Sequence, residues 1–263
     1  MAKKQKRSRK KGTKKKSGLL SNLILILAVC VFVFSGYQLY QIFSEYHEGK
    51  KEYEEIRELV IQEEPKKEPE EQKEPEVQPR FTVDFATLQQ MTPDTVGWIR
   101  FEEPSEISYP VVKGRDNEEY LTRTFEANDN KLGTLFVDKD NTGTFTDRNT
   151  IIYGHNMKNG TMFAKLLKFR EESFLKKHHV IILYTPKKTM YLKVISSYAV
   201  KAQDQMPITF ANEMQKKEYI TKIRRMSEPS IKLDDKKIDR IYTFVTCSYE
   251  RDDNRTYVHA VEE

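Results

Sequence analysis

The chain has 263 residues, of which 38% are hydrophobic and 32% are charged, and its formal net charge is +5 at pH 7. The positive charge is concentrated at the start, where the first sixteen residues include ten Lys or Arg and no acid. The remaining residues hold 35 Lys and Arg against 40 Asp and Glu, so this larger part is mildly acidic. Nucleic-acid binding, which depends on a surplus of positive charge, has no support there.

An uncharged segment follows the basic tail at residues 17–44. Its unbroken apolar run, residues 23–34, reaches with its flanks about the ~20 residues that a bilayer requires. Tyr37 and Tyr40 suit the membrane interface, and basic residues favour the cytoplasmic side. We therefore expect a cytoplasmic tail at 1–16 and a transmembrane anchor at 17–44, with the rest of the chain outside the cell. A cleaved signal peptide is the alternative, but the apolar stretch exceeds the usual core of about 7 to 15 residues.

A highly charged segment comes next. Its first part carries Tyr53, Ile56 and Val60 at near-helical spacing. Its second part, residues 65–79, is rich in Pro, Glu and Lys. Such a composition cannot bury a core and favours an extended, solvated chain. The sequence therefore predicts a stalk at 45–80 that holds a folded head away from the membrane.

From residue 81 onward the composition turns globular, with aromatic and β-branched residues throughout. About 180 residues are ample for one domain, which we place at 81–263. Apolar runs with β-branched residues predict roughly eight strands, and three further segments predict helices. This pattern is typical of a β-rich barrel or sandwich with helical insertions. The expected strands lie at 96–101, 107–112, 133–137, 150–153, 180–185, 190–199, 241–249 and 255–261. The expected helices lie at 84–91, after a cap at Thr161 with Phe163, Leu166 and Leu167 buried, and at 212–226.

Cys247 is the one cysteine outside the membrane segment, and it ends an apolar, β-branched run. A lone thiol in an oxidising compartment is open to damage, so it is a candidate nucleophile; the alternative is a small buried hydrophobe. If residues 241–249 and 255–261 form a hairpin, symmetric pairing sets Cys247 opposite Arg255 on the same face. A guanidinium there would favour the thiolate and hold the oxyanion of an acyl-transfer intermediate. The alternative for Arg255 is an ordinary surface residue.

A thiol acyl-transfer site also needs an acid to protonate the leaving amine, and histidine is the usual choice among the side chains. The chain has five histidines. His47 lies in the expected stalk, and His178 and His179 precede a strand. His259 is about 13 Å along its strand from the arginine, which is too far. His155 remains, on a loop after a β-branched strand, where catalytic groups tend to lie. Spacing alone leaves its adjacency to the cysteine open.

Several separated motifs occur in order along the chain: GWI at 97–99, YPVV at 109–112, DN at 116–117, YL at 120–121, GTLFVD at 133–138, IIYGHNM at 151–157, GTMF at 160–163 and TFVTC at 243–247, followed by Arg255. Together they resemble the sortases, which are membrane-anchored cysteine transpeptidases of Gram-positive bacteria. The resemblance covers essentially all of 81–263 and includes the N-terminal anchor. The motifs before residue 140 point to class B of that family.

The resemblance implies an eight-stranded sortase-like β-barrel with helical insertions, mainly β, behind a transmembrane helix and a charged stalk. It places His155, Cys247 and Arg255 on the family's catalytic histidine, cysteine and arginine. In the implied reaction, the Cys247 thiolate attacks a threonine carbonyl in the C-terminal sorting signal of a secreted protein. Arg255 holds the oxyanion, His155 protonates the leaving amine, and an amine of a peptidoglycan precursor such as lipid II resolves the thioester. The product is a surface protein joined to the cell wall.

The resemblance also implies substrate contacts and partners. Asn117 and Tyr153 match positions near the substrate groove, and Thr246 matches the threonine that precedes the catalytic cysteine. Phe244 departs from the family, which usually has leucine there; another apolar residue on the face away from Cys247 should pack acceptably. The expected partners are secreted proteins with a sorting signal, the peptidoglycan amine and the plasma membrane.

No cofactor and no metal are implied. Asp138 and Asp140 imitate the start of a calcium loop, but Asn149 stands where such a loop requires Glu. Two other functions stay open. A pilin-polymerising sortase would use a lysine side chain as acceptor, although the lid element typical of such enzymes is missing between Pro79 and Trp98. A membrane-anchored binding module without catalysis would have no need for the His, Cys and Arg together.

Overall fold

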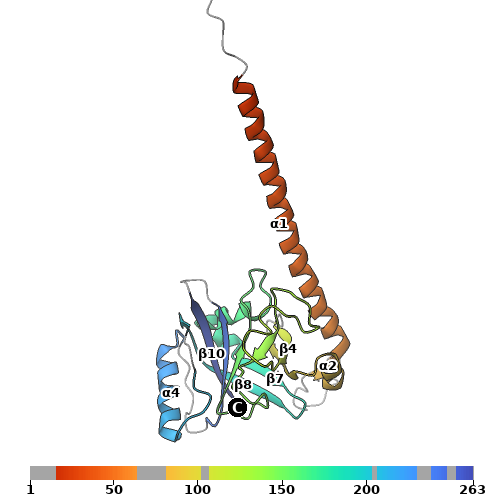
Figure 1. Ribbon diagram of the computed structural model, residues 1–263. Helices are drawn as coiled ribbons and strands as arrows, with labels where there is room; N and C mark the ends of the chain where they lie inside the picture. Colours follow the sequence, from red (N-terminus) through yellow and green to blue (C-terminus); the bar gives the residue numbers. More distant parts are fainter. Residues whose placement is uncertain are drawn as a thin grey trace, which may run out of the picture. The chain divides into compact units, whose positions relative to one another are not determined.

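The chain folds into two compact units, Met1–Glu45 and Tyr46–Glu263 (Figure 1). The first unit holds the N-terminal part of α1, a helix that spans Lys16–Val60. The second unit holds the end of α1 and a β-barrel, and it carries the candidate site. The computed structural model describes residues 16–63, 81–101, 107–202, 206–229, 238–247 and 253–262.

The N-terminal part of α1 is long and apolar enough to cross a membrane. Its large apolar side chains are exposed, with Phe32 at 80%. Contiguous apolar exposure of this kind is costly in water and is typical of a surface that faces lipid or a partner. A signal sequence passes the same test of length and composition, so the anchor expected at 17–44 stays a prediction.

Eight strands within the described residues close into a barrel, which confirms the expected fold class. Around the barrel, the strands follow the order β10-β8-β7-β3-β4-β5-β6-β9. β4 pairs with β5 and β6 pairs with β9 in parallel, whereas the other neighbours are antiparallel. The strands are β3 (Thr95–Phe101), β4 (Ser108–Val112), β5 (Leu135–Val137), β6 (Asn149–Tyr153), β7 (Val180–Tyr184), β8 (Thr189–Lys201), β9 (Ile241–Cys247) and β10 (Asn254–Glu262).

Further elements precede the barrel or lie between its strands. Two helices begin at side-chain caps: Asp84 accepts a hydrogen bond from the Thr87 N–H, and Asn212 accepts one from the Gln215 N–H. Such caps satisfy backbone donors that the first turn of a helix leaves unpaired. The elements are β1 (Ile61–Glu63), which pairs with β2 (Phe81–Val83), the α-helices α2 (Phe85–Met91), α3 (Glu172–Lys177) and α4 (Glu213–Met226), and the 3-10 helix η1 (Phe163–Arg170).

Strand alternation divides the apolar side chains between two cores. On β9, Tyr242 and Phe244 belong to the main core, which fills the barrel. Ile241 and Val245 lie on the other face and belong to a second core outside the barrel. The buried Ile220 of α4 covers this second core, and Figure 1 shows α4 beside the barrel. β9 is therefore buried on both faces, as a central strand between two layers.

The folded unit begins earlier than the expected boundary at residue 81. Tyr53, Ile56 and Val60, in the last turns of α1, are only 1–2% exposed and pack into the main core. The prediction of a solvated stalk at 45–80 was therefore wrong for its helical part, because one apolar helix face is enough to bury the helix despite its charged remainder. The Pro-rich part of the expected stalk, residues 64–80, lies outside the described residues.

The segment after Thr161 also differs from the expected helix. It forms η1, a 3-10 helix, and Thr161 does not cap it. Phe163 and Leu166 are buried as expected, but Phe169 is the third buried residue, and Leu167 is only half-buried. A 3-10 helix has three residues per turn, so positions i, i+3 and i+6 share one face. α3 and the short β1–β2 pair were not predicted from the sequence.

Replacing Ile56 by alanine should lower the free energy of unfolding by about 2–5 kcal/mol, the usual effect of truncating a buried aliphatic side chain. The measurement is urea denaturation of the full chain in detergent micelles, followed by fluorescence of Trp98, the one tryptophan, which is buried in the barrel. Lys51→Ala, on the exposed face of the same helix, is the matched control and should change stability by less than about 0.5 kcal/mol. Equal stability of Ile56→Ala and wild type would show that the end of α1 contributes nothing to the fold.

Candidate active site

Three neighbouring strands, β6, β9 and β10, carry the residues that the sequence singled out. β6 runs parallel to β9, with Tyr153 paired to Val245. Parallel neighbours end at the same edge, so the residues that follow them leave the barrel side by side. His155 comes two residues after Tyr153, and Cys247 comes two residues after Val245, at the end of β9. The Gly154 N–H extends this ladder to the Val245 carbonyl at 3.1 Å.

The antiparallel strand β10 completes the arrangement. Its pairing with β9 sets Arg255 opposite Cys247, which confirms the register predicted for the hairpin. The backbones of His155, Cys247 and Arg255 therefore reach one edge of the barrel from three adjacent strands, although they are far apart in the chain. The side chain of Cys247 and residues 248–252 of the turn lie outside the described part of the chain.

The His155 side chain is held by the connection between β4 and β5. Its Nε2 lies 2.6 Å from the backbone carbonyl oxygen of Leu121. A carbonyl oxygen only accepts hydrogen bonds, so Nε2 carries a proton and donates it. Nδ1 is then the ring nitrogen that is left for proton transfer. His155 is half-buried, and its backbone carbonyl accepts from the Phe163 N–H at 2.8 Å, which ties this loop to η1.

Close packing explains the glycine immediately before this histidine. A Cβ at Gly154 would lie 2.7 Å from Phe163 Cδ2 and would also overlap the Leu135 side chain. Both neighbours are fully buried in the main core. A densely packed core has no space for the displaced atoms, so any larger residue here would move the chain that carries His155.

The Arg255 side chain is half-buried at the start of β10. Its Nη1 donates to the Asn254 carbonyl at 3.1 Å. A guanidinium carries five N–H donors in a planar fork and never loses its charge in proteins. Among the described residues this is the one hydrogen bond of the Arg255 side chain, and the other donors of the fork suit a substrate carbonyl or an oxyanion.

Asn117 and Tyr153, the expected substrate-groove residues, converge on a carboxylate that was not predicted as part of the site. Tyr153 Oη donates to Asp138 Oδ2 at 2.9 Å, and Asn117 Nδ2 donates to the same oxygen at 3.0 Å. Burial, together with the charge of Asp138, raises the pKa of Tyr153, so its hydroxyl remains a donor. The sequence offered one sign of this role, because Asp138 directly follows β5 and ends the GTLFVD motif at 133–138.

Hydrogen bonds also engage the oxygens of the calcium-like sequence that begins at Asp138. Asp138 also accepts from the Asp140 N–H at 2.9 Å, and the Asp140 carboxylate accepts from Lys139 Nζ at 2.8 Å. Asn117 Oδ1 accepts from the Lys139 N–H at 2.7 Å. These oxygens are bonded to N–H and O–H groups instead of forming a shell of calcium ligands. Among the described residues, no group of three or more His, Cys, Asp or Glu is arranged to hold a metal ion.

Thr246 lies on the inner side of β9. By alternation it shares the face of Tyr242 and Phe244, and it is only 2% exposed. Within the described residues its Oγ1 has no hydrogen-bond partner, and neither does that of Thr256, the residue opposite it on β10. A buried hydroxyl without a partner lowers stability. The structure therefore places the Thr246 side chain in the barrel, so it can influence a bound substrate only through its backbone or its packing.

His259 is a buried structural histidine. Its Nδ1 lies 2.9 Å from Thr243 Oγ1, and its Nε2 lies 3.1 Å from Tyr198 Oη. Burial lowers the pKa of His259 to about 3, so the ring is neutral near pH 7. On β9 its partner Thr243 is four residues away from Cys247, in agreement with the distance argument that excluded His259 from the site.

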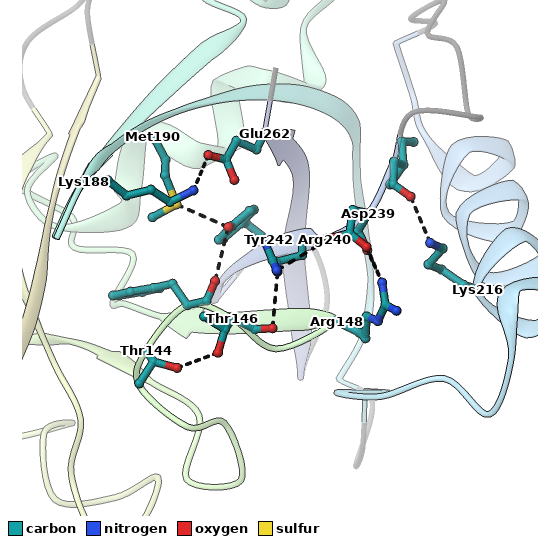
Figure 2. Close-up of polar contacts among 12 residues, drawn as sticks. Thr144, Thr146, Arg148, Lys188, Met190, Lys216, Asp239, Arg240, Tyr242 and Glu262 are labelled. Carbon is teal, nitrogen blue, oxygen red and sulfur yellow. Dashed lines mark hydrogen bonds and ion pairs between the residues drawn. The ribbon is translucent and has the colours of Figure 1, made fainter.

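A polar cluster fastens the other end of β9 (Figure 2). Arg148, just before β6, forms an ion pair with Asp239, just before β9. Arg240 Nε donates to the Thr146 carbonyl at 3.3 Å, and Lys216 of α4 donates to a backbone carbonyl at 3.0 Å. These contacts connect the start of β9 to β6 and α4. The parallel register that unites the candidate residues is thus supported from the opposite end of the strands.

Comparisons with known proteins agree with this geometry. A family model described as the sortase domain matches residues 102–263. Sortase B of Staphylococcus aureus is 29% identical over 226 residues, which are 86% of this chain and 88% of that protein. Sortase B of Listeria monocytogenes is 33% identical over 172 residues, which are 64% of this chain and 69% of that protein. The crystal structure of sortase B from Bacillus anthracis matches with a TM-score of 0.68 at 28% identity, and the match covers 84% of this chain and 99% of that one.

The buried His259 predicts a pH dependence of stability. Its pKa of about 3 in the folded chain is below the ordinary value of 6.5 expected after unfolding. As the pH falls below 6.5, the unfolded chain binds a proton that the folded chain excludes, so this group should cost up to about 1.4 kcal/mol per pH unit. Stability is fully present above pH 6.5 and is lost as the pH falls toward 3.

The measurement is urea denaturation of the full chain in micelles between pH 4 and 7. His259→Gln should lose this part of the slope, whereas His47→Gln, at an exposed position of α1, should keep it. Identical slopes for wild type and His259→Gln would contradict a buried, neutral imidazole.

Proposed function

This chain belongs to class B of the sortase family, and from that premise we propose how its own residues carry out transpeptidation. Cys247 is the nucleophile, His155 transfers the protons, and Arg255 holds the substrate carbonyl. One observation carries the proposal: the three backbones meet at one edge of the barrel, where β6, β9 and β10 lie side by side.

In the first half-reaction, the Cys247 thiolate attacks the carbonyl carbon of a threonine in the sorting signal. Negative charge moves to the carbonyl oxygen, where the Arg255 guanidinium stabilises it. When the intermediate collapses, the C–N bond breaks and the leaving amine takes a proton from His155. Because Nε2 is bonded to the Leu121 carbonyl, Nδ1 delivers this proton. A thioester between the threonine and Cys247 remains.

In the second half-reaction, an amine of a peptidoglycan precursor such as lipid II attacks the thioester carbonyl. His155 takes a proton from this amine at Nδ1, and Cys247 leaves as the thiolate. The new amide bond joins the surface protein to the cell-wall precursor, and the enzyme returns to its starting state. Water in place of the amine gives hydrolysis, which makes the same site an endopeptidase.

We place the binding site for the sorting signal beside the Asp138 contacts. Asn117, in the connection between β4 and β5, and Tyr153, at the end of β6, both donate to Asp138. Their polar atoms are therefore used inside the protein, so we place them as walls that a bound sorting signal packs against. The Thr246 side chain is buried inside the barrel, on the other face of β9, and contributes through its packing.

We place the enzyme in the plasma membrane, with residues 1–16 in the cytoplasm and the folded unit outside. The apolar, exposed start of α1 supports an anchor at 17–44, and the Lys and Arg before it support this orientation. Secreted proteins with a sorting signal and lipid-linked acceptors are also held at the membrane. Tethering all three components raises their effective concentration.

Cys247→Ala should abolish covalent chemistry. The full chain in micelles is incubated with a library of sorting-signal peptides and analysed by intact mass. Wild type should form a thioester adduct, and Cys30→Ala, which removes the chain's other cysteine, should form it equally. Glycine-based amines represent a wall precursor and lysine-based amines represent a pilin, so adding each in turn shows which acceptor the enzyme uses. If no peptide is cleaved and Cys247 is inert to thiol reagents, the chain is a binding module and the proposal fails.

Arg255→Lys should reduce kcat/KM by about a hundredfold or more, because an ammonium cannot reproduce the planar fork that holds an oxyanion. Steady-state kinetics with the preferred peptide is the measurement. Arg225→Lys makes the same chemical change at an exposed position of α4 and should stay within about threefold of wild type, as expected of a surface substitution. Wild-type turnover in Arg255→Lys would argue against a role in holding the carbonyl.

A further inference from the structure

The histidine that transfers protons depends on one backbone carbonyl. In the described structure, His155 Nε2 bonds to the Leu121 oxygen, and Leu121 belongs to the connection between β4 and β5, residues 113–134. This connection is not a strand of the barrel, so no barrel ladder fixes the position of the carbonyl. The groups that hold the Leu121 carbonyl therefore determine where Nδ1 of His155 lies relative to the candidate site.

Gly133 packs directly against that carbonyl. Its φ is +58°, and a Cβ built there would lie 2.6 Å from the Leu121 oxygen and 3.0 Å from the Leu121 carbonyl carbon. The next residue supports the same contact, because the Thr134 N–H donates to the Tyr120 carbonyl at 2.9 Å. The Leu121 carbonyl is thus enclosed between Gly133 on one side and the His155 ring on the other. A side chain has no room at this close approach, and the positive φ also favours glycine.

Tyr53, from the end of α1, fixes Gly133 in turn. Its Oη donates to the Gly133 carbonyl at 2.6 Å and lies 3.0 Å from Thr134 Oγ1. Tyr53 is 2% exposed, and its ring packs edge-on against Tyr109 at 5.3 Å. Burial raises the pKa of Tyr53, so the hydroxyl stays protonated and keeps donating.

The neighbouring residue on α1 holds a second part of the same connection. Glu52 Oε1 accepts from the Glu126 N–H at 2.9 Å, and Glu52 Oε2 accepts from Asn128 Nδ2 at 3.1 Å. Two adjacent side chains of one helix therefore hold two separate parts of the connection. A helix fixed in the core is rigid compared with a loop, so it supplies the rigidity that the connection lacks.

We propose that Tyr53 and Gly133 are positioning residues for His155. Through the Leu121 carbonyl they set the direction of the imidazole, so the end of α1 acts as a brace for the proton-transfer step. The inference rests on the proposed function of His155. A purely structural role would lower stability without changing turnover by the remaining folded enzyme.

The test compares Tyr53→Phe and Gly133→Ala in the full chain in micelles. Tyr53→Phe keeps the ring and removes the hydroxyl, so kcat should fall about fivefold, which is the size of one ordinary hydrogen bond. Gly133→Ala displaces the carbonyl itself, so kcat should fall about tenfold to a hundredfold. KM for the sorting-signal peptide should stay within about twofold in both variants, because the substrate contacts are unchanged.

Gly143→Ala is the matched control. Gly143 also has a positive φ, +76°, but a Cβ there meets the Lys113 side chain at 3.2 Å and no atom of Leu121. It should keep the wild-type kcat. A second control repeats Tyr53→Phe in a His155→Ala background, where it should have no further effect on the residual rate, because it acts only through the histidine.

A spectroscopic measurement tests whether Tyr53 and Gly133 hold His155 without measuring activity. With ¹⁵N-labelled histidine, the hydrogen-bonded Nε2–H of His155 should give a protected proton signal, assigned by its loss in His155→Gln. The signal should persist in Gly143→Ala and broaden or vanish in Gly133→Ala and Tyr53→Phe.

An unchanged signal and unchanged kcat in both test variants would overturn the inference, as would an equal loss of kcat in the His155→Ala background. If wild type transfers no peptide at all, the proposed function fails, and the imidazole signal still decides whether Tyr53 and Gly133 hold His155.

Discussion

The parallel pairing of β6 with β9 is the contact on which the candidate site depends. If these two strands were antiparallel, their carboxyl ends would lie at opposite edges of the barrel, and His155 and Cys247 would be separated by about 15 Å or more. The register is specified by buried polar groups as well as by apolar packing. Thr243 Oγ1 donates to Asn149 Oδ1 at 2.7 Å, between the two strands. A slip by one residue would break this bond between two buried groups, so it favours one register of the pairing.

The two pairings of β9 differ in how far the sequence predicts them. The hairpin with β10 is local, and symmetric pairing about a short polar turn was enough to predict Arg255 opposite Cys247. The pairing with β6 joins segments that are separated, within the described residues, by two α-helices, a 3-10 helix and two strands, and no local pattern encodes such a contact. From the residues alone, His155 was therefore a candidate with an open distance to the cysteine. The resemblance to the family supplied the adjacency that the residue pattern lacked.

Two features were missed for different physical reasons. The end of α1 has apolar residues at helical spacing, but charged side chains on its other faces suggested a solvated stalk. Burial of a helix requires only one apolar face when a barrel supplies the remainder of the core. Asp138 was interpreted from its acidic neighbours in sequence as part of an incomplete calcium loop. Its actual partners, Tyr153 and Asn117, come from other parts of the chain, and their hydrogen bonds depend on the closed barrel.

His155 and His259 show how surroundings separate two roles of one side chain. Both ring nitrogens of His259 have hydroxyl neighbours in a fully buried site, so the ring is fixed and neutral. His155 is half-buried and has one nitrogen on the Leu121 carbonyl, an arrangement that limits rotation and leaves the other nitrogen for the proton transfer that we propose. The orientation of the His155 ring is therefore only as fixed as the Leu121 carbonyl to which it bonds. Because the carbonyl lies in a connection outside the barrel ladder, its rigidity has to come from buried neighbours. Gly133 lies against this carbonyl, and Tyr53 bonds to Gly133. The end of α1 is therefore part of the folded unit and not the start of a spacer.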